Sequence, residues 1–338
     1  MVFHSGFRFL TVSTLACVLV FPSILLQSLS ARALQATAIA PDHSRSNPSG
    51  GQTSLASMEN DIRAGKYLAV EPALRTYVQS HPSSWRARYD LGYVLFSVRA
   101  GTEPLADRIK ESITELSKSL QLNLNDADAH KILGLDLTMI QRDDLAEAEF
   151  KEAVRLDPRS AEMHYFLARH YMGQSRYPLA KSELETAIRL DPAYMKAYEN
   201  LAITFDRMGN AGEALRLYLN AVALDKQQAE GWERPYLDLA RFYDEQNNPD
   251  AALTYIRKAL ARNPKSDESF FELAKIEREK ADWHAALDAL QKAIVINPYQ
   301  AEYYYLLGRT YRQLGRIDES KRAFENYLKY KDVAAPVS

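Results

Sequence analysis

The amino-acid sequence predicts an all-α solenoid, a fold in which pairs of helices stack one after another along the chain. Three observations lead to this fold class: a step of 34 residues, columns of small residues that keep this step, and prolines that keep it too. A period between about 20 and 50 residues is typical of solenoid repeats. In the first column a glycine or alanine follows a leucine, at Gly134, Ala168, Ala202, Ala240, Ala274 and Gly308.

Further columns share the same spacings, including four extra residues between the third unit and the fourth. Twelve residues after the first column stands a second small residue, at Ala146, Ala180, Ala214, Ala252, Ala286 and Ser320. Alanines recur at Ala153, Ala187, Ala221, Ala259 and Ala293, and five residues later stand Pro158, Pro192, Lys226, Pro264 and Pro298. Small residues let two paired helices approach closely, and proline ends the second helix of each pair. Glycine is expected to form the break between helices near Gly173, Gly209 or Gly315.

These residues resemble the tetratricopeptide repeat family. The shared features are the Leu-Gly or Leu-Ala pair, the aromatic residue three positions later at Tyr171, Phe205, Tyr243 and Tyr311, and the Asp-Pro or Asn-Pro end. Six units run from about 126 to 333. Leu91-Gly92 followed by Ser112 fits another unit with about eight extra residues, and Gly65 through Pro82 fits half of one more. The resemblance implies a right-handed superhelix of about eight helix-turn-helix repeats over residues 55–333.

The N-terminal segment 1–33 reads as a signal peptide. A short positive region with His4 and Arg8 precedes an apolar run from Phe9 to about Leu26, and Ala31-Arg32-Ala33 has the small-x-small form of a cleavage site. We therefore expect an exported protein, periplasmic or secreted. The alternative is an uncleaved membrane anchor with the rest of the chain outside the cytoplasm, because roughly 18 apolar residues approach the length that spans a bilayer.

The remaining termini and the composition add limits. Residues 34–54 are rich in Ser, Pro, Gly and Asn and read as a flexible linker, and 334–338 form a short tail. The net charge of −2 disfavours a nucleic-acid partner. The single cysteine, Cys17, lies in the apolar run, so a mature chain would lack a thiol nucleophile.

A search for catalytic motifs also favours a protein that is not an enzyme. The sequence contains no phosphate loop, dinucleotide glycine pattern or His-Glu-x-x-His motif. His164 and His170 stand six residues apart, on different sides of one helix, which argues against a zinc pair. We expect no catalytic residue, no cofactor and no metal.

Candidate partner-binding residues lie on the first helix of each repeat, which the family resemblance places on a concave groove. The residue after the first small column is Leu135, Arg169, Ile203, Arg241, Lys275 or Arg309, and four of these six are basic. About one turn away, the same face carries Lys131, Tyr165, Phe271, Arg278, Tyr305 and Arg312. Cations interleaved with aromatic rings indicate a groove for an acidic or carboxylate-bearing protein segment. The alternative is a solvated groove whose cations pair with Glu162, Glu199, Glu268 and Glu302.

The last helix, about Asp318 to Lys331, has no clear polar capping helix after it. We expect Tyr327 and Leu328 to be partly exposed there, which would allow a homo-oligomer or docking on another protein. The leading functional hypothesis is a protein–protein interaction scaffold of the cell envelope. The alternative is a structural or assembly subunit of an envelope, secretion, pilus or cytochrome maturation complex that docks through its end or convex face.

Overall fold

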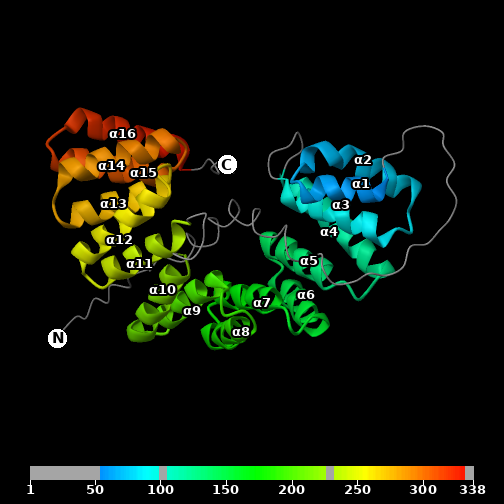
Figure 1. The fold of residues 1–338 in the computed structure, drawn as a ribbon. Coiled ribbons are helices and arrows are strands. Elements are labelled where there is room, and N and C mark those ends of the chain that lie inside the picture. The colour runs from blue at the N-terminus through cyan, green and yellow to red at the C-terminus, as the bar shows by residue number, and fades with distance from the viewer. Residues whose placement is uncertain (1–53, 99–104, 226–231, 332–338) are drawn as a thin grey trace, which may run out of the picture. The chain divides into compact units, whose positions relative to one another are not determined.

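The computed structural model describes residues 54–98, 105–225 and 232–331, and these residues form helices joined by short turns (Figure 1). No strand occurs in these three ranges, which confirms the predicted all-α class. The helices fall into two compact units, with the boundary between Leu124 and Asn125. The predicted signal peptide or anchor, the 34–54 linker except Ser54, and the 334–338 tail lie outside the described residues.

Helices alternate as the first and second members of successive pairs. The first unit contains α1 (Leu55–Arg63), α2 (Tyr67–Ser80), α3 (Trp85–Ser97) and α4 (Leu105–Leu122). The second unit contains α5 (Ala127–Met139), α6 (Asp143–Leu156), α7 (Ala161–Gly173), α8 (Tyr177–Leu190), α9 (Met195–Arg207), α10 (Ala211–Asp225), α11 (Arg234–Glu245), α12 (Pro249–Arg262), α13 (Asp267–Glu279), α14 (Trp283–Ile296), α15 (Ala301–Gln313) and α16 (Ile317–Tyr330).

The starts and stops of the helices repeat as the sequence indicates. The first helix of several pairs begins after a serine or aspartate whose side chain accepts a hydrogen bond from the backbone N–H three residues later, as Asp126 does from Ala129 at 3.1 Å. The prolines of the repeat stand two residues beyond the end of the second helix; Pro158, for example, follows Leu156 in this way. These boundaries confirm the predicted helical pairs.

One detail of the turn between paired helices differs from the prediction. Gly209 and Gly315 do take left-handed backbone angles, with φ of 79° and 72°. Gly173, however, is the last residue of α7, and the left-handed position falls on Ser175 with φ of 57°. Two backbone hydrogen bonds close this turn, from Ser175 to Met172 and from Arg176 to Tyr171, both 2.9 Å long. These bonds hold a conformation that a non-glycine residue otherwise resists.

The columns of small residues lie where paired helices cross. The alanines of these columns are almost completely buried. A Cβ atom built on Gly308 would stand 2.9 Å from the Phe324 ring, so only glycine fits against that ring without a shift. Ser320, which replaces alanine in the second column, is buried and donates a hydrogen bond of 2.8 Å to the Gly308 carbonyl oxygen. Close helix crossing is thus encoded by residue size, as the sequence predicts.

In the second unit the first helices of neighbouring repeats contact one another. Such contacts join α5 to α7, α7 to α9 and α11 to α13. We call the side of this unit that its odd-numbered helices form the inner face; these helices carry the candidate partner-binding residues. Among the described helices, none is both long enough and apolar enough to cross a membrane.

Candidate functional site

At its beginning, the inner face of the second unit carries a cation that is already neutralised. The Lys131 side chain is buried, and its Nζ donates to Asp128 at 2.6 Å and to Glu162 on α7 at 3.2 Å. Burial alone lowers the pKa of Lys131, but the two carboxylates raise it by more. Lys131 therefore joins two repeats through an internal ion pair, and its charge is compensated from within the chain.

On α7, aromatic rings surround the next cation. The guanidinium carbon of Arg169 lies 5.7 Å from the Tyr165 ring centre and 5.9 Å from that of Phe166. Tyr165 is buried and packs 5.1 Å from the Tyr194 ring, and burial raises the pKa of its hydroxyl group. Tyr165 is consequently part of the interior of the repeat, and its ring is not exposed on the inner face.

Arg241 on α11 is held by three carboxylates. Its Nε donates to Glu272 at 2.9 Å, one of its terminal nitrogens donates to Glu268 at 2.8 Å, and Asp238 lies at 3.6 Å. Burial lowers the pKa of Arg241, but these acids raise it overall. Lys275 on α13 shares Glu272, at 2.7 Å.

The pairing expected as the alternative interpretation is thus present for part of the groove. Glu162 and Glu268 do neutralise groove cations. Glu199 and Glu302 do not form an ion pair with any other described residue. Glu199 is 3% exposed and its Oε1 atom has no hydrogen-bond partner. Burial, and then the nearby Asp238, raise the pKa of Glu199 well above its ordinary value.

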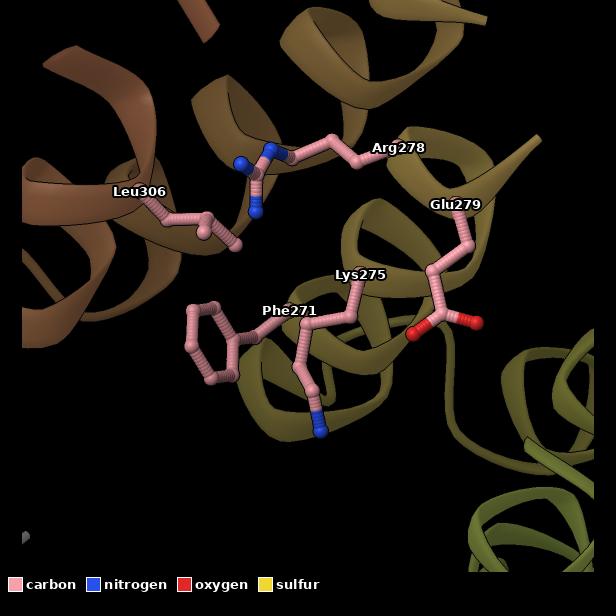
Figure 2. Close-up of a pocket in the computed structure, with 5 residues that line it drawn as sticks. All are labelled: Phe271, Lys275, Arg278, Glu279 and Leu306. Atoms are coloured by element: carbon pink, nitrogen blue, oxygen red, sulfur yellow. The ribbon is translucent and has the colours of Figure 1, made fainter. Parts of the chain in front are cut away.

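Between α13 and α15 the inner face contains a cleft. Phe271, Lys275, Arg278, Glu279 and Leu306 line an open cleft of about 350 Å³ between α13 and α15 (Figure 2). We call these five residues the C-terminal cleft. Phe271 is half-buried and packs 4.8 Å from the Tyr303 ring. The cleft therefore combines an apolar wall with basic side chains.

Three arginines at this end have no carboxylate partner within the ranges that the structure describes. The Nε atom of Arg278 is buried without a hydrogen bond. Burial, and then the neighbouring Arg309 guanidinium, lower the pKa of Arg278. Arg309 lies over the Tyr305 ring at 5.9 Å and Arg312 over the Phe324 ring at 5.6 Å. Arg309 and Arg312 thus contact aromatic rings and not described carboxylates.

Two adjacent tyrosines of the last repeat differ in their exposure. Tyr304 is buried, whereas 43% of Tyr305 is exposed. Tyr327 is half-buried and Leu328 is 58% exposed, which confirms the expected partial exposure of the last helix. Tyr305, Arg309 and Arg312 therefore form an accessible continuation of the C-terminal cleft.

Residues that sequence reasoning missed border the cleft on both sides. Leu306 follows Tyr305 directly; it is buried in the core of the last repeats and, with Phe271, forms the apolar wall of the cleft. On the other side, Asp244 of α11 faces Glu279 of α13, and burial followed by the charge of Glu279 raises the pKa of Asp244 to about 6. The sequence pattern could have predicted this acidic pair, because Asp244 stands four residues after Ala240 of the first small column and Glu279 stands five residues after Ala274.

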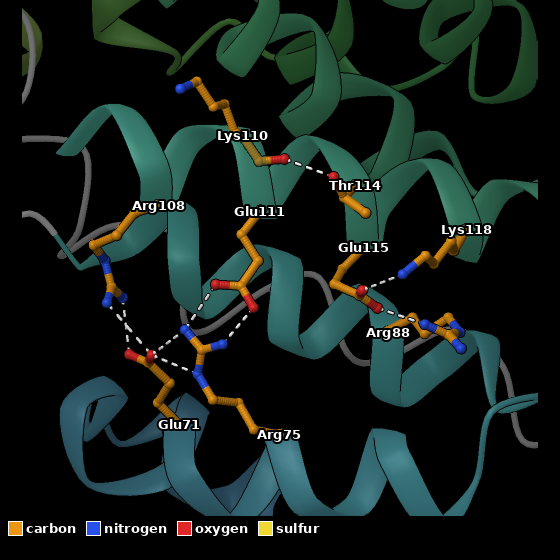
Figure 3. Close-up of polar contacts among 9 residues, drawn as sticks. All are labelled: Glu71, Arg75, Arg88, Arg108, Lys110, Glu111, Thr114, Glu115 and Lys118. Carbon is orange, nitrogen blue, oxygen red and sulfur yellow. Dashed lines mark hydrogen bonds and ion pairs between the residues drawn. The ribbon is translucent and has the colours of Figure 1, made fainter. Parts of the chain in front are cut away.

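A second cluster of charged side chains lies in the first unit, between α2 and α4 (Figure 3). Arg75 bridges Glu71 and Glu111, and the buried Arg108 donates to Glu71 at 2.8 Å. The Nε atom of Arg108 also donates to the Val98 carbonyl oxygen at 3.2 Å. Each charge has a partner, so this cluster holds the unit together and does not form an open site.

The described residues contain no group of three His, Cys, Asp or Glu side chains placed to hold a metal ion. His164, considered above as a ligand, instead contacts Glu183 at 2.6 Å and the Pro158 carbonyl oxygen at 3.1 Å. The Glu183 hydrogen bond raises the pKa of His164, although burial opposes it. This histidine connects the two helices of its repeat.

Comparisons with known proteins agree with this architecture. Solved structures with a similar fold include a tetratricopeptide repeat protein from Parabacteroides merdae, at 14% identity and a TM-score of 0.61, covering 76% of this chain and 96% of that one. Yeast Tom70 follows at 16% identity and 0.62, covering 82% and 57%. The Cut9-Hcn1 complex of APC/C matches at 19% and 0.51, covering 81% of this chain but only half of the matched chain. At such identities these likenesses show the fold alone.

The sequence itself matches a protein-family model. Models described as tetratricopeptide repeat match residues 141–180, 167–229, 237–301 and 301–332. No curated protein matches the sequence. The family matches together span more than half of the chain and coincide with the helical pairs α6 to α16, so this chain belongs to the tetratricopeptide repeat family.

Proposed function

We propose that this protein is an exported, non-enzymatic scaffold that binds an acidic segment of a partner protein along the inner face of α13 and α15. Its family membership and fold support a protein–protein interaction scaffold, because tetratricopeptide repeat proteins are generally of this kind. The location of the groove, the charge of the partner and the export are the finer parts of the proposal.

The observation that carries the proposal is the absence of a carboxylate partner for Arg278, Arg309 and Arg312 among the described residues. Upstream cations on the same face, such as Lys131 and Arg241, are neutralised by acids of the following repeat. Arginine binds a carboxylate through two parallel hydrogen bonds, and aromatic rings beside it supply apolar contact area. An acidic segment would therefore satisfy the part of the face that the chain leaves uncompensated.

A photo-crosslinking experiment tests the binding face. A photoreactive phenylalanine analogue replaces Tyr305 on the inner face or, as the matched control, Leu219 on α10. These two side chains are nearly equally exposed, at 43% and 40%. We expect the Tyr305 position to crosslink a partner in cells, the Leu219 position not to, and Arg309→Glu to abolish the crosslink. Crosslinking at Leu219 alone would contradict the proposal.

The second candidate, an assembly subunit that docks through its end, draws support from the last described repeat. Leu328 on α16 is 58% exposed, and in the preceding repeat Val295 near the end of α14 is 83% exposed and Tyr299, in the turn after α14, is 44% exposed. A crosslinker at Leu328 distinguishes this candidate, because it would then capture the partner whether or not Arg309 is replaced.

Export remains a proposal that rests on the sequence of residues 1–33. Cell fractionation followed by N-terminal sequencing of the purified protein tests it. We expect a periplasmic or secreted chain that begins at Leu34. A chain that retains Met1 in the membrane fraction would favour the anchor, and one found in the cytoplasm would refute export.

A further inference from the structure

The C-terminal cleft has an apolar floor with one cation over it. Figure 2 shows the Arg278 side chain extending from α13 toward Leu306 of α15, with the Phe271 ring nearby, whereas the ends of Lys275 and Glu279 point elsewhere. Lys275 is engaged by Glu272 at 2.7 Å. Arg278 is therefore the cation that a ligand in this cleft would meet together with the apolar wall.

The charge of Arg278 is held in an unfavourable environment. A buried guanidinium nitrogen without a hydrogen bond costs free energy, because it has lost water and gained no acceptor. The neighbouring Arg309 adds repulsion between like charges. An anion placed between these two arginines would offset the repulsion between them, and the apolar wall would strengthen the attraction by excluding water.

We propose that the C-terminal cleft recognises a pair of adjacent features in the partner segment: a large apolar side chain packed on Phe271 and Leu306, and an acidic side chain bound by Arg278 and Arg309. This inference rests on the proposed function and specifies the chemistry of its site. A volume of about 350 Å³ accommodates one large side chain with its neighbour.

The acidic pair Asp244 and Glu279 gives the bound segment a direction. It lies on the α11 side of the cleft, and at neutral pH it carries negative charge, since the pKa of Asp244 is raised only to about 6. A carboxylate of the partner is repelled from that side and attracted to the side of Arg309. The acidic residue is consequently placed toward α15, with the apolar residue beside it over Phe271.

Four short peptides that differ at one pair of positions test this inference against the full chain. Built on the same Gly-Ser background and labelled with a fluorophore, they carry Glu-Phe, Gln-Phe, Glu-Ser or Gln-Ser. Fluorescence anisotropy measures their affinities. We expect Glu-Phe to bind about tenfold more tightly than Gln-Phe or Glu-Ser. Equal affinity of all four peptides would overturn the inference.

Substitutions in the cleft test which residues recognise the acidic side chain of the peptide and which recognise the apolar one. Arg278→Gln is expected to remove the preference for Glu over Gln while the preference for Phe over Ser remains. Leu306→Phe fills the cleft without making it polar. It should remove the preference for Phe over Ser while the preference for Glu over Gln remains. Arg257→Gln on the exposed surface of α12 makes the same charge change away from the site and should alter neither preference. If Arg278→Gln leaves the preference for Glu intact, Arg278 is not the receptor of the acid.

The outcomes separate this inference from the proposed function. Circular dichroism and denaturant unfolding of each variant identify any loss of fold before affinities are compared. If Tyr305 crosslinks a partner in an Arg309-dependent manner but the peptides show no pair preference, the groove function stands and the two-part recognition fails. If neither result is obtained, both are wrong.

Discussion

Two stretches of the inner face of the second unit differ in how their cations are compensated. On α5 and on α11, a cation pairs with an acid 31 residues later on the next repeat: Lys131 pairs with Glu162, and Arg241 with Glu272. At α13 the same separation leads from Arg278 to another arginine, Arg309, which lies close enough to lower the pKa of Arg278. We call the part of the inner face from α5 to α11 the closed stretch, and the part from α13 to α15, where an arginine stands in place of that acid, the open stretch.

The largest effect is expected from breaking the closed stretch. Arg241→Met removes the cation that contacts Asp238, Glu268 and Glu272, and leaves these three carboxylates with only Arg234 and Lys275 to neutralise them. We expect the free energy of unfolding to fall by about 2–3 kcal/mol, below the value for a fully buried pair because Arg241 is partly exposed. Denaturant unfolding followed by circular dichroism measures this change. Arg309→Met at the equivalent position of α15 should change stability by about 0.5 kcal/mol or less; an equal loss in both variants would contradict the comparison.

Glu199 is the exception within the closed stretch, and its pH dependence shows this. Its charge faces Asp238, Arg234, Lys196 and Asp225, and its raised pKa means that the folded protein binds its proton more tightly than the unfolded chain. The stability from this proton is complete below the ordinary pKa of a glutamate and is lost as pH rises through the folded pKa. Glu199→Gln should therefore gain about 1 kcal/mol relative to the wild type near pH 8, and little near pH 5. A difference that does not vary with pH would refute this assignment.

A smaller effect on stability is expected when an acid is introduced into the open stretch. Arg309→Glu supplies the acid that Arg278 lacks at this separation. We expect the free energy of unfolding to rise by about 0.5 kcal/mol or more, while the affinity for the Glu-Phe peptide falls below detection. Unfolding curves and anisotropy measure the two properties on the same sample. Loss of stability together with binding would indicate that Arg309 supports the fold directly.

The smallest effect is expected from the acidic pair Asp244 and Glu279 beside the C-terminal cleft. Asp244→Asn removes a negative charge on the α11 side and should raise the affinity for the Glu-Phe peptide by about two- to threefold at neutral pH. The gain should shrink as pH falls below about 6, where Asp244 of the wild type becomes protonated. Affinities measured across this range check the prediction, and Asn248→Asp at the start of α12 serves as a charge control outside this pair.

Most of the fold could be predicted because residue size and helix boundaries are local properties. The step of 34 residues located the crossing points, and Gly308 against Phe324 illustrates how size alone specifies them. The left-handed turn at Ser175 was not predicted, because the same pair of backbone hydrogen bonds closes the turn whether the left-handed residue is Ser175 or a glycine such as Gly209.

The site could be predicted only in part, because pairing across repeats depends on the rotation of one repeat relative to the next. Sequence columns identified the cations and also the acids Glu162 and Glu268. They did not show that Glu272 neutralises Arg241 and Lys275, or that Arg278 and Arg309 approach each other. A residue such as Leu306 has the same sequence context whether it is buried against a neighbour or lines a cleft.

The contact between Arg108 and the Val98 carbonyl oxygen has a consequence for the first unit. Arg108 lies on α4, and this bond ties the end of α3 directly to α4 across the insertion that separates them. This hydrogen bond joins the two helices through Val98 and Arg108, which lie on either side of residues 99–104. We expect that a reporter domain can be inserted between residues 99 and 104 while α3 and α4 retain their packing, because the Arg108–Val98 hydrogen bond joins the two helices outside this segment.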